Sequence, residues 1–155
     1  MTEVFKDLCI VMREELSAFA FLSQDDLKKA SAFFQGKRFS SGEILWEEGD
    51  PCAYVAFIVS GRVQVKKKTK LKGNQVILGI YSKGAYVGVL CILDGSPRAV
   101  TAEAIEDSSV VVISREDFDK LSMKHPDIGN ALMKGMLMGV SKNLKNSFSR
   151  LVAVF

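Results

Sequence analysis

Residues 84–101 read GAYVGVLCILDGSPRAVT, and this stretch says more about the fold than any other part of the chain. A glycine opens a short apolar segment, and a second turn, Asp94-Gly95-Ser96-Pro97, leads from it into a β-like run. That turn delivers a single arginine, Arg98. Backbone amides at the start of a short helix bind anions, and an arginine held nearby pairs with a phosphate through two hydrogen bonds. The stretch therefore predicts a pocket for one compact phosphate.

On both sides of this stretch, residues 37–114 alternate short β-rich runs with glycine turns. Val63 and Val65, for example, alternate with polar residues, as in a strand with one buried face. The runs are KRFS, EILW, YVAFIVS, RVQVKKK, QVILGIYS, VTAEAIE and SVVVIS. Several short strands with frequent turns predict an antiparallel sandwich, barrel or roll.

Helical patterns flank the β-rich zone. Apolar residues at steps of three and four over residues 3–21 predict an amphipathic helix, and Ser23 is the expected N-cap of a second, short helix. Ser114 can cap another short helix, and Pro126 suits the first turn of a longer one. Apolar residues recur at intervals of four along that last helix: Ile128, Leu132, Met136, Val140, Leu144, Phe148 and Val152. We therefore expect one α+β domain over residues 1–155, helical over 1–36, a β-roll over 37–114 and helical again over 115–155.

Composition and charge narrow the class of protein. The chain has 155 residues, of which 48% are hydrophobic, as expected of one globular domain with a sizeable core. Its net charge of +3 is too small to predict DNA binding. No apolar run is long enough for a membrane span, and the N-terminus does not resemble a signal peptide. These features predict a cytoplasmic protein that binds neither DNA nor membrane.

Cysteine and histidine usage argues against catalysis and metal binding. Cys9, Cys52 and Cys91 are an odd count, widely spaced and without a CxxC pair, so we expect reduced, buried thiols and no zinc site. His125 is the only histidine, and one histidine supplies neither a metal site nor a catalytic triad. The sequence therefore predicts a non-enzymatic protein without a metal or cofactor.

Four segments in order resemble the cyclic nucleotide-binding domain family, which includes the catabolite activator protein and the regulatory subunits of protein kinase A. They are FLSQDDLKKASAFFQGKRFSSGEILWEEGD (21–50), AFIVSGRVQV (56–65), GAYVGVLCILDGSPRAVTAEA (84–104) and SREDFDKLSMKHPDI (114–128). The resemblance implies a β-roll, or double-stranded β-helix, whose phosphate-binding cassette lies at the third segment. It also implies that the ligand is a cyclic nucleotide.

The resemblance implies a role for each cassette residue. Gly88 precedes a short helix, the backbone amides near Leu90 and Ala99 face the cyclic phosphate, and Arg98 neutralises it. Ala99 stands where cGMP-selective members tend to carry threonine, which favours cAMP. On the last helix, Asn143 is placed to contact the base.

One position departs from the family pattern. The family carries a glutamate after the cassette glycine, which accepts a hydrogen bond from the ribose 2′-hydroxyl, and this chain has Val89 there. A hydrogen bond to a charged group contributes about 1.5–3 kcal/mol, so its loss corresponds to binding that is roughly tenfold to over a hundredfold weaker.

Two functions follow as alternatives. In the first, a stand-alone sensor binds cAMP, and the hinge over residues 114–126 repositions the last helix by a population shift toward a protein partner. In the second, the cassette is degenerate and the domain is a dimerising interaction module. Gly135 and Gly139 indicate close backbone approach on the last helix, either to the chain's own β-roll or to the same helix of a second subunit. The length of that helix favours a homodimer.

Overall fold

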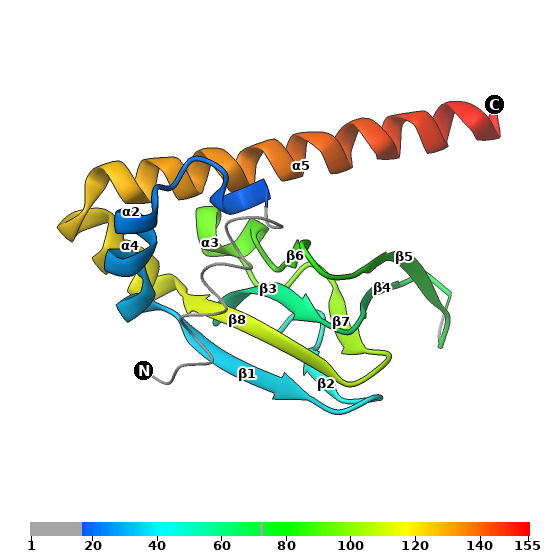
Figure 1. Cartoon of the computed structure of the whole chain (residues 1–155). Helices are drawn as coiled ribbons and strands as arrows, with labels where there is room; N and C mark the ends of the chain where they lie inside the picture. The colour runs from blue at the N-terminus through cyan, green and yellow to red at the C-terminus, as the bar shows by residue number, and fades with distance from the viewer. Residues whose placement is uncertain (1–16, 72) are drawn as a thin grey trace.

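Two antiparallel four-stranded sheets pack face to face as a roll beneath a layer of helices (Figure 1). The computed structural model describes residues 17–71 and 73–155. The first sheet has the order β1 (Gln35–Phe39), β8 (Ser108–Ser114), β3 (Tyr54–Ser60), β6 (Tyr86–Val87), and the second the order β2 (Ile44–Trp46), β7 (Thr101–Ala104), β4 (Val63–Lys68), β5 (Gln75–Tyr81). The predicted α+β class with an antiparallel β-roll is confirmed, and each of the seven predicted runs contains a strand. The two-residue strand β6 is an addition to them.

The two inner strands of the first sheet, β3 and β8, are buried on both faces, which explains their continuous apolar runs. Side chains of a strand point alternately to opposite faces. In β3, Ala56 and Ile58 point into the core between the two sheets, whereas Val55 and Phe57 point to the helices. The side chains of the central strand β8 alternate in the same way. Each of the strands β3 and β8 therefore contributes side chains to both cores.

The helices form where the sequence provides their caps. Ser23 and Asp26 form a capping box at the start of α2 (Gln24–Ala30), with hydrogen bonds of 3.0 and 3.1 Å. Ser114 accepts a hydrogen bond from the Asp117 amide at the start of α4 (Arg115–Lys124), and Pro126 opens α5 (Pro126–Val154). The remaining helical elements are η1 (Ser17–Phe19), η2 (Ser31–Phe33) and α3 (Leu90–Asp94). Most of the helix predicted over residues 3–21 lies outside the described residues, and η1 covers its described end.

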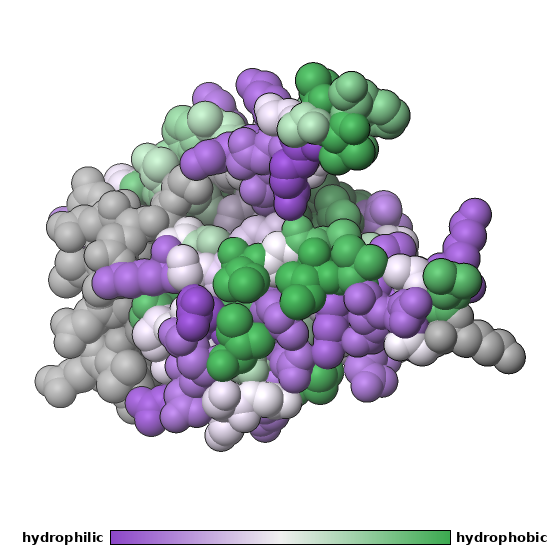
Figure 2. Space-filling view, turned by 90° about the vertical axis from the view of Figure 1, so that its right-hand side faces the viewer, coloured by the Kyte–Doolittle hydropathy of each residue, from purple (hydrophilic) through white to green (hydrophobic). Residues whose placement is uncertain are grey.

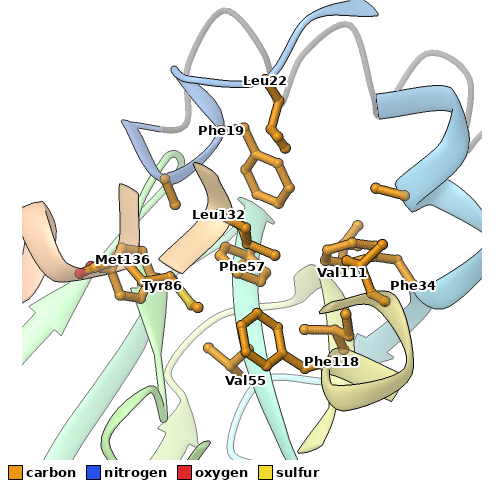
Figure 3. Close-up of a cluster of buried hydrophobic side chains, with 14 of the residues drawn as sticks. Phe19, Leu22, Phe34, Val55, Phe57, Tyr86, Val111, Phe118, Leu132 and Met136 are labelled. Atoms are coloured by element: carbon orange, nitrogen blue, oxygen red, sulfur yellow. The ribbon is translucent and has the colours of Figure 1, made fainter. Parts of the chain in front are cut away.

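The helix α5 has a packed half and an exposed half. Ile128, Leu132 and Met136 are buried in the core between the first sheet and the helices, called here the helix-facing core; Figure 3 shows Leu132 and Met136. Leu144 and Phe148 are more than half exposed. Beyond its packed half the helix runs out past the roll above β5 (Figure 1). The regular four-residue spacing in the sequence therefore covers two different environments.

Both glycines of α5 make their close approach within the chain. A Cβ atom on Gly135 would overlap the backbone of Ala18 in η1, and one on Gly139 would overlap the hydroxyl of Tyr86 in β6. Of the two interpretations of these glycines, packing against the chain's own domain is the one that the structure supports.

Candidate functional site

The turn from β6 into α3 requires a glycine. Gly88 has a φ of +86°, a left-handed conformation that glycine adopts without steric strain. A Cβ atom there would lie 2.5 Å from an Nη atom of Arg98 and 2.7 Å from the ring of Trp46. The absence of a side chain at Gly88 thus brings its backbone directly against the arginine.

Arg98 is buried and points into the protein, with only 4% of its surface exposed. Its guanidinium lies 3.6 Å from the centroid of the Trp46 ring. One Nη donates to the Gly88 carbonyl at 3.2 Å, and the other donates to the Tyr54 carbonyl. Among the described residues, its buried Nε finds no hydrogen-bond acceptor. The guanidinium therefore has one buried donor that its described neighbours leave unpaired.

The backbone of Arg98 is held as firmly as its side chain. Its amide donates to the Asp50 carbonyl, and its carbonyl accepts from the Gly49 amide, both at 2.8 Å. Burial lowers the pKa of the guanidinium to about 10, while Tyr54 and Asp50 oppose that shift. Arg98 is therefore still a cation at neutral pH.

A cavity of about 1240 Å³ lies between the cassette, β5 and α5, and Arg98 lines it. Every site residue predicted from the sequence lines the same cavity: Gly88, Val89, Leu90, Arg98, Ala99 and Asn143. The structure thus brings the cassette together with a residue 45 positions further along, on α5. Figure 2 shows the face with β5, where apolar side chains gather below the end of α5. No carboxylate is found among the described residues that line the cavity.

The cassette residues differ in their exposure. Val89 is buried at the start of α3 and belongs to the helix-facing core, whereas Leu90 is 54% exposed. The carbonyl of Ala99 accepts a hydrogen bond from Lys67 at 2.8 Å. The nearby Glu103 is paired with Lys66 at 2.9 Å and does not line the cavity. No described acid therefore takes the place of the missing cassette glutamate.

Two aromatic residues that the sequence analysis did not select complete the arginine site. Trp46 packs edge-on against Tyr54, with ring centroids 5.6 Å apart, and its indole N–H donates to the Val100 carbonyl at 3.0 Å. Only the strand pairing brings these residues to Arg98, which is 52 positions beyond Trp46. The only signal in the sequence that could have pointed to Trp46 is that it is the single tryptophan of the chain.

The expectation of reduced thiols is wrong for two of the three cysteines. Cys52 and Cys91 form a disulfide across 39 residues, because the fold places the start of α3 beside the chain that enters β3. Because the two cysteines are 39 residues apart, nothing in the sequence indicated this contact. Cys9 lies outside the described residues. Within those residues, no cluster of histidine, cysteine or acidic side chains could hold a metal ion.

The family model for the cyclic nucleotide-binding domain matches residues 36–125, so the chain belongs to that family. This is a family of regulatory and generally non-enzymatic domains. Among curated proteins, the chain is 26% identical over 114 residues to the cyclic AMP receptor protein of Thermus thermophilus, covering 74% of this chain and 52% of that protein. It is 28% identical over 108 residues to the cAMP-dependent protein kinase regulatory subunit of Hypocrea atroviridis, covering 70% and 22%. The chain thus spans about half, or less, of these relatives.

Solved structures share the fold. A cyclic nucleotide-binding domain from Methylobacillus flagellatus superposes with a TM-score of 0.86 at 22% identity, over 99% of this chain and 85% of that one. The regulatory domain of Toxoplasma gondii protein kinase A, determined with cAMP, superposes with a TM-score of 0.72 at 16% identity, over 87% and 51%. Across the described part of the chain, no helix combines the length and hydropathy that a bilayer crossing requires.

Proposed function

We propose that this domain is a regulatory sensor that binds a cyclic nucleotide in the cavity between its cassette and α5, with no catalytic activity of its own. The observation that carries the proposal is Arg98, a buried cation without an ionic partner among the described residues that lines that cavity. A buried charge without an ionic partner is unfavourable, and a phosphate on the guanidinium would remove that deficit. The curated relatives named for cyclic AMP support the same ligand class.

The proposed ligand is cAMP in preference to cGMP. Ala99, next to Arg98, has no hydroxyl to offer a guanine. The Asn143 side chain has both an amide donor and a carbonyl acceptor, which match the donor and acceptor edges of adenine. It lines the same cavity, across from the cassette.

The proposed affinity is lower than a cassette glutamate would provide. Val89 lines the cavity at the position of the family's glutamate but is buried and apolar, so it offers no acceptor to a ribose hydroxyl. With no carboxylate among the described lining residues, the phosphate and the base carry the recognition.

The proposed output passes from the cassette to α5 through Tyr86. This residue lies in β6, two positions before Gly88, and its hydroxyl donates to the Met136 carbonyl of α5 (Figure 3). A phosphate that tightens the turn at Gly88 therefore acts on the strand that holds the helix. The ligand shifts the position of α5 only by its differential affinity for the two states.

Thermal denaturation with cAMP and with cGMP tests the sensor. At a hundredfold excess over the dissociation constant, a bound ligand stabilises the folded state by about 2.7 kcal/mol, or about 5–10 °C for a chain of this size. Arg98→Gln should abolish the shift, because it removes the charge while keeping a polar side chain at this position. Arg38→Gln is the matched control, since Arg38 is exposed on β1 and does not line the cavity. A parent that is unaffected by millimolar nucleotide would refute the sensor.

A second candidate function is a dimerising interaction module, and the exposed half of α5 favours it. Leu144, Phe148 and Leu151 are 52%, 55% and 59% exposed, and an apolar helix face of this kind is normally covered. A homodimer through α5 is compatible with the sensor as well.

Sedimentation equilibrium tests the dimer. The parent should sediment as a dimer, and Phe148→Glu should convert it to a monomer because the carboxylate would be buried in the contact. Met123→Glu is the control, since Met123 is 83% exposed on α4. A parent that is monomeric at high micromolar concentration would exclude the homodimer.

A further inference from the structure

The Cys52–Cys91 disulfide lies against the arginine that the proposed function assigns to the phosphate. An Nη of Arg98 is 3.3 Å from the Sγ of Cys91, and Cys91 is 4% exposed in the first turn of α3. The same Nη donates to the Gly88 carbonyl. The guanidinium thus contacts a disulfide sulfur and the cassette backbone at once.

From this contact we infer that the Cys52–Cys91 pair is a reversible redox site that sets the charge facing Arg98, and with it the affinity of the cavity for a phosphate. The disulfide sulfur is neutral, so the oxidised chain leaves the positive charge of Arg98 for the ligand. In the reduced chain, the guanidinium favours the Cys91 thiolate, because opposite charges in contact attract. The thiolate then competes with the phosphate for the same cation. This inference rests on the proposed function for its ligand, but its chemistry belongs to Cys91 and Arg98 alone.

The two cysteines line different cavities and differ in exposure, which assigns their roles in the exchange. Cys91 lines the large cavity, whereas Cys52 is half-buried and lines a second one, of about 420 Å³, with Arg115, Glu116 and Asp119 of α4. A small-molecule thiol or disulfide therefore reaches the sulfur of Cys52 first. The lining of that cavity includes one arginine and two acids, so Arg115 offers an anionic thiol one positive charge beside the two carboxylates.

Reduction proceeds in two exchanges. The thiolate of a small-molecule thiol attacks Cys52 Sγ, the Cys52–Cys91 bond breaks, and its electron pair leaves on Cys91 as the thiolate that Arg98 stabilises. A lower basicity of the leaving sulfur speeds this step. A second thiolate attacks the mixed disulfide on its external sulfur and releases Cys52, so two external thiols become one disulfide, and the protons they lost are available to the protein sulfurs. Oxidation by a small-molecule disulfide is the reverse, with Cys91 resolving the mixed disulfide on Cys52.

Two single-cysteine variants separate the effect of the Cys91 thiolate charge from the effect of losing the Cys52–Cys91 cross-link. Cys52→Ser removes the disulfide and keeps the Cys91 thiol, whereas Cys91→Ser removes the disulfide and the thiol together. By isothermal titration with cAMP, the reduced parent and Cys52→Ser should bind about tenfold more weakly than the oxidised parent, the lower end of a hydrogen bond to a charged group. Cys91→Ser should bind close to the oxidised parent, with or without reductant. Equal weakening in both variants, or a parent whose affinity ignores reductant, would overturn the inference.

A measurement without nucleotide keeps the inference testable if the proposed function fails. The ultraviolet absorbance of the thiolate is followed against pH in Cys52→Ser, with the Cys52→Ser/Cys91→Ser double variant subtracted. The Cys91 thiolate should form at lower pH when Arg98 is present than in an added Arg98→Gln background. Identical titrations in the two backgrounds would refute the thiolate–guanidinium pair. Absence of cAMP binding in every state, together with a shifted titration, would refute the ligand and leave the redox site standing.

Discussion

Replacing Tyr86 with phenylalanine should change how the stability of the domain depends on pH, in a way that isolates one hydroxyl. That hydroxyl donates to the Met136 carbonyl in a site that is 9% exposed. Losing a buried hydrogen bond costs about 1 kcal/mol, so at neutral pH the Tyr86→Phe chain should melt about 2–4 °C lower than the parent.

At alkaline pH the order of stability should reverse. Burial raises the pKa of Tyr86 from 10.0 to about 12, against a weaker opposing backbone hydrogen bond. The neutral phenol therefore contributes stability that is complete below pH 10 and is lost as the pH rises through 12. Two pKa units correspond to roughly 2–3 kcal/mol, which exceeds the hydrogen bond that phenylalanine lacks. The curves of unfolding free energy against pH for the parent and for Tyr86→Phe should cross at about pH 11.

Urea denaturation of both chains from pH 8 to pH 12 measures this difference. All other titrating groups are common to the two proteins, so those that do not interact with Tyr86 cancel in the subtraction. Tyr81→Phe is the comparison variant: it removes a tyrosine hydroxyl from β5 in the same cavity and leaves the contact with α5 in place, but it also removes a charge that contributes to the raised pKa of Tyr86. A parent-minus-variant difference that stays constant over this range would show that the Tyr86 phenol is not held against α5.

Three further substitutions test the packing and the cassette. Gly135→Ala should lower the free energy of unfolding by about 1–3 kcal/mol in urea, because its Cβ would overlap the Ala18 backbone, whereas Gly36→Ala, with open space around it, is the control; equal stability of the two would contradict the contact with η1. Val89→Glu should strengthen cAMP binding about tenfold in isothermal titration by supplying an acceptor for the ribose, and no gain would show that the sugar does not lie there. Gly88→Ala should lose cAMP binding and stability together, since it strains a φ of +86° and displaces the arginine; a variant that binds as the parent does would refute the close approach.

Much of the architecture could be predicted because local patterns agree with tertiary burial. The runs at β3 and β8 are short, apolar and bounded by turns, and both become central strands. Ser23, Ser114 and Pro126 mark helix starts through interactions within one turn, which the sequence contains in full. The family resemblance placed Arg98 and Asn143 on one cavity although 45 residues separate them.

What could not be predicted depends on contacts between residues that are far apart in the sequence. The disulfide joins residues 39 apart, and nothing near Cys52 or Cys91 indicates the partner. The Trp46 ring reaches Arg98 only because β2 and β7 are paired. The four-residue apolar spacing of α5 does not reveal where burial ends, because a helix keeps the same pattern whether it covers its own domain or projects beyond it.

The division of α5 into a buried half and a mostly exposed half, which contacts β5 through the Arg150–Leu78 hydrogen bond, has a mechanical consequence. Tyr86 contacts the helix near Gly139, and some 15 residues, or about 22 Å of helix, extend beyond that point. A rigid rod pivoting there by about 10° would carry its tip through about 4 Å, whereas the gripped carbonyl would hardly move. A sub-ångström adjustment at the cassette would thus be magnified into a displacement large enough for a neighbouring molecule to detect.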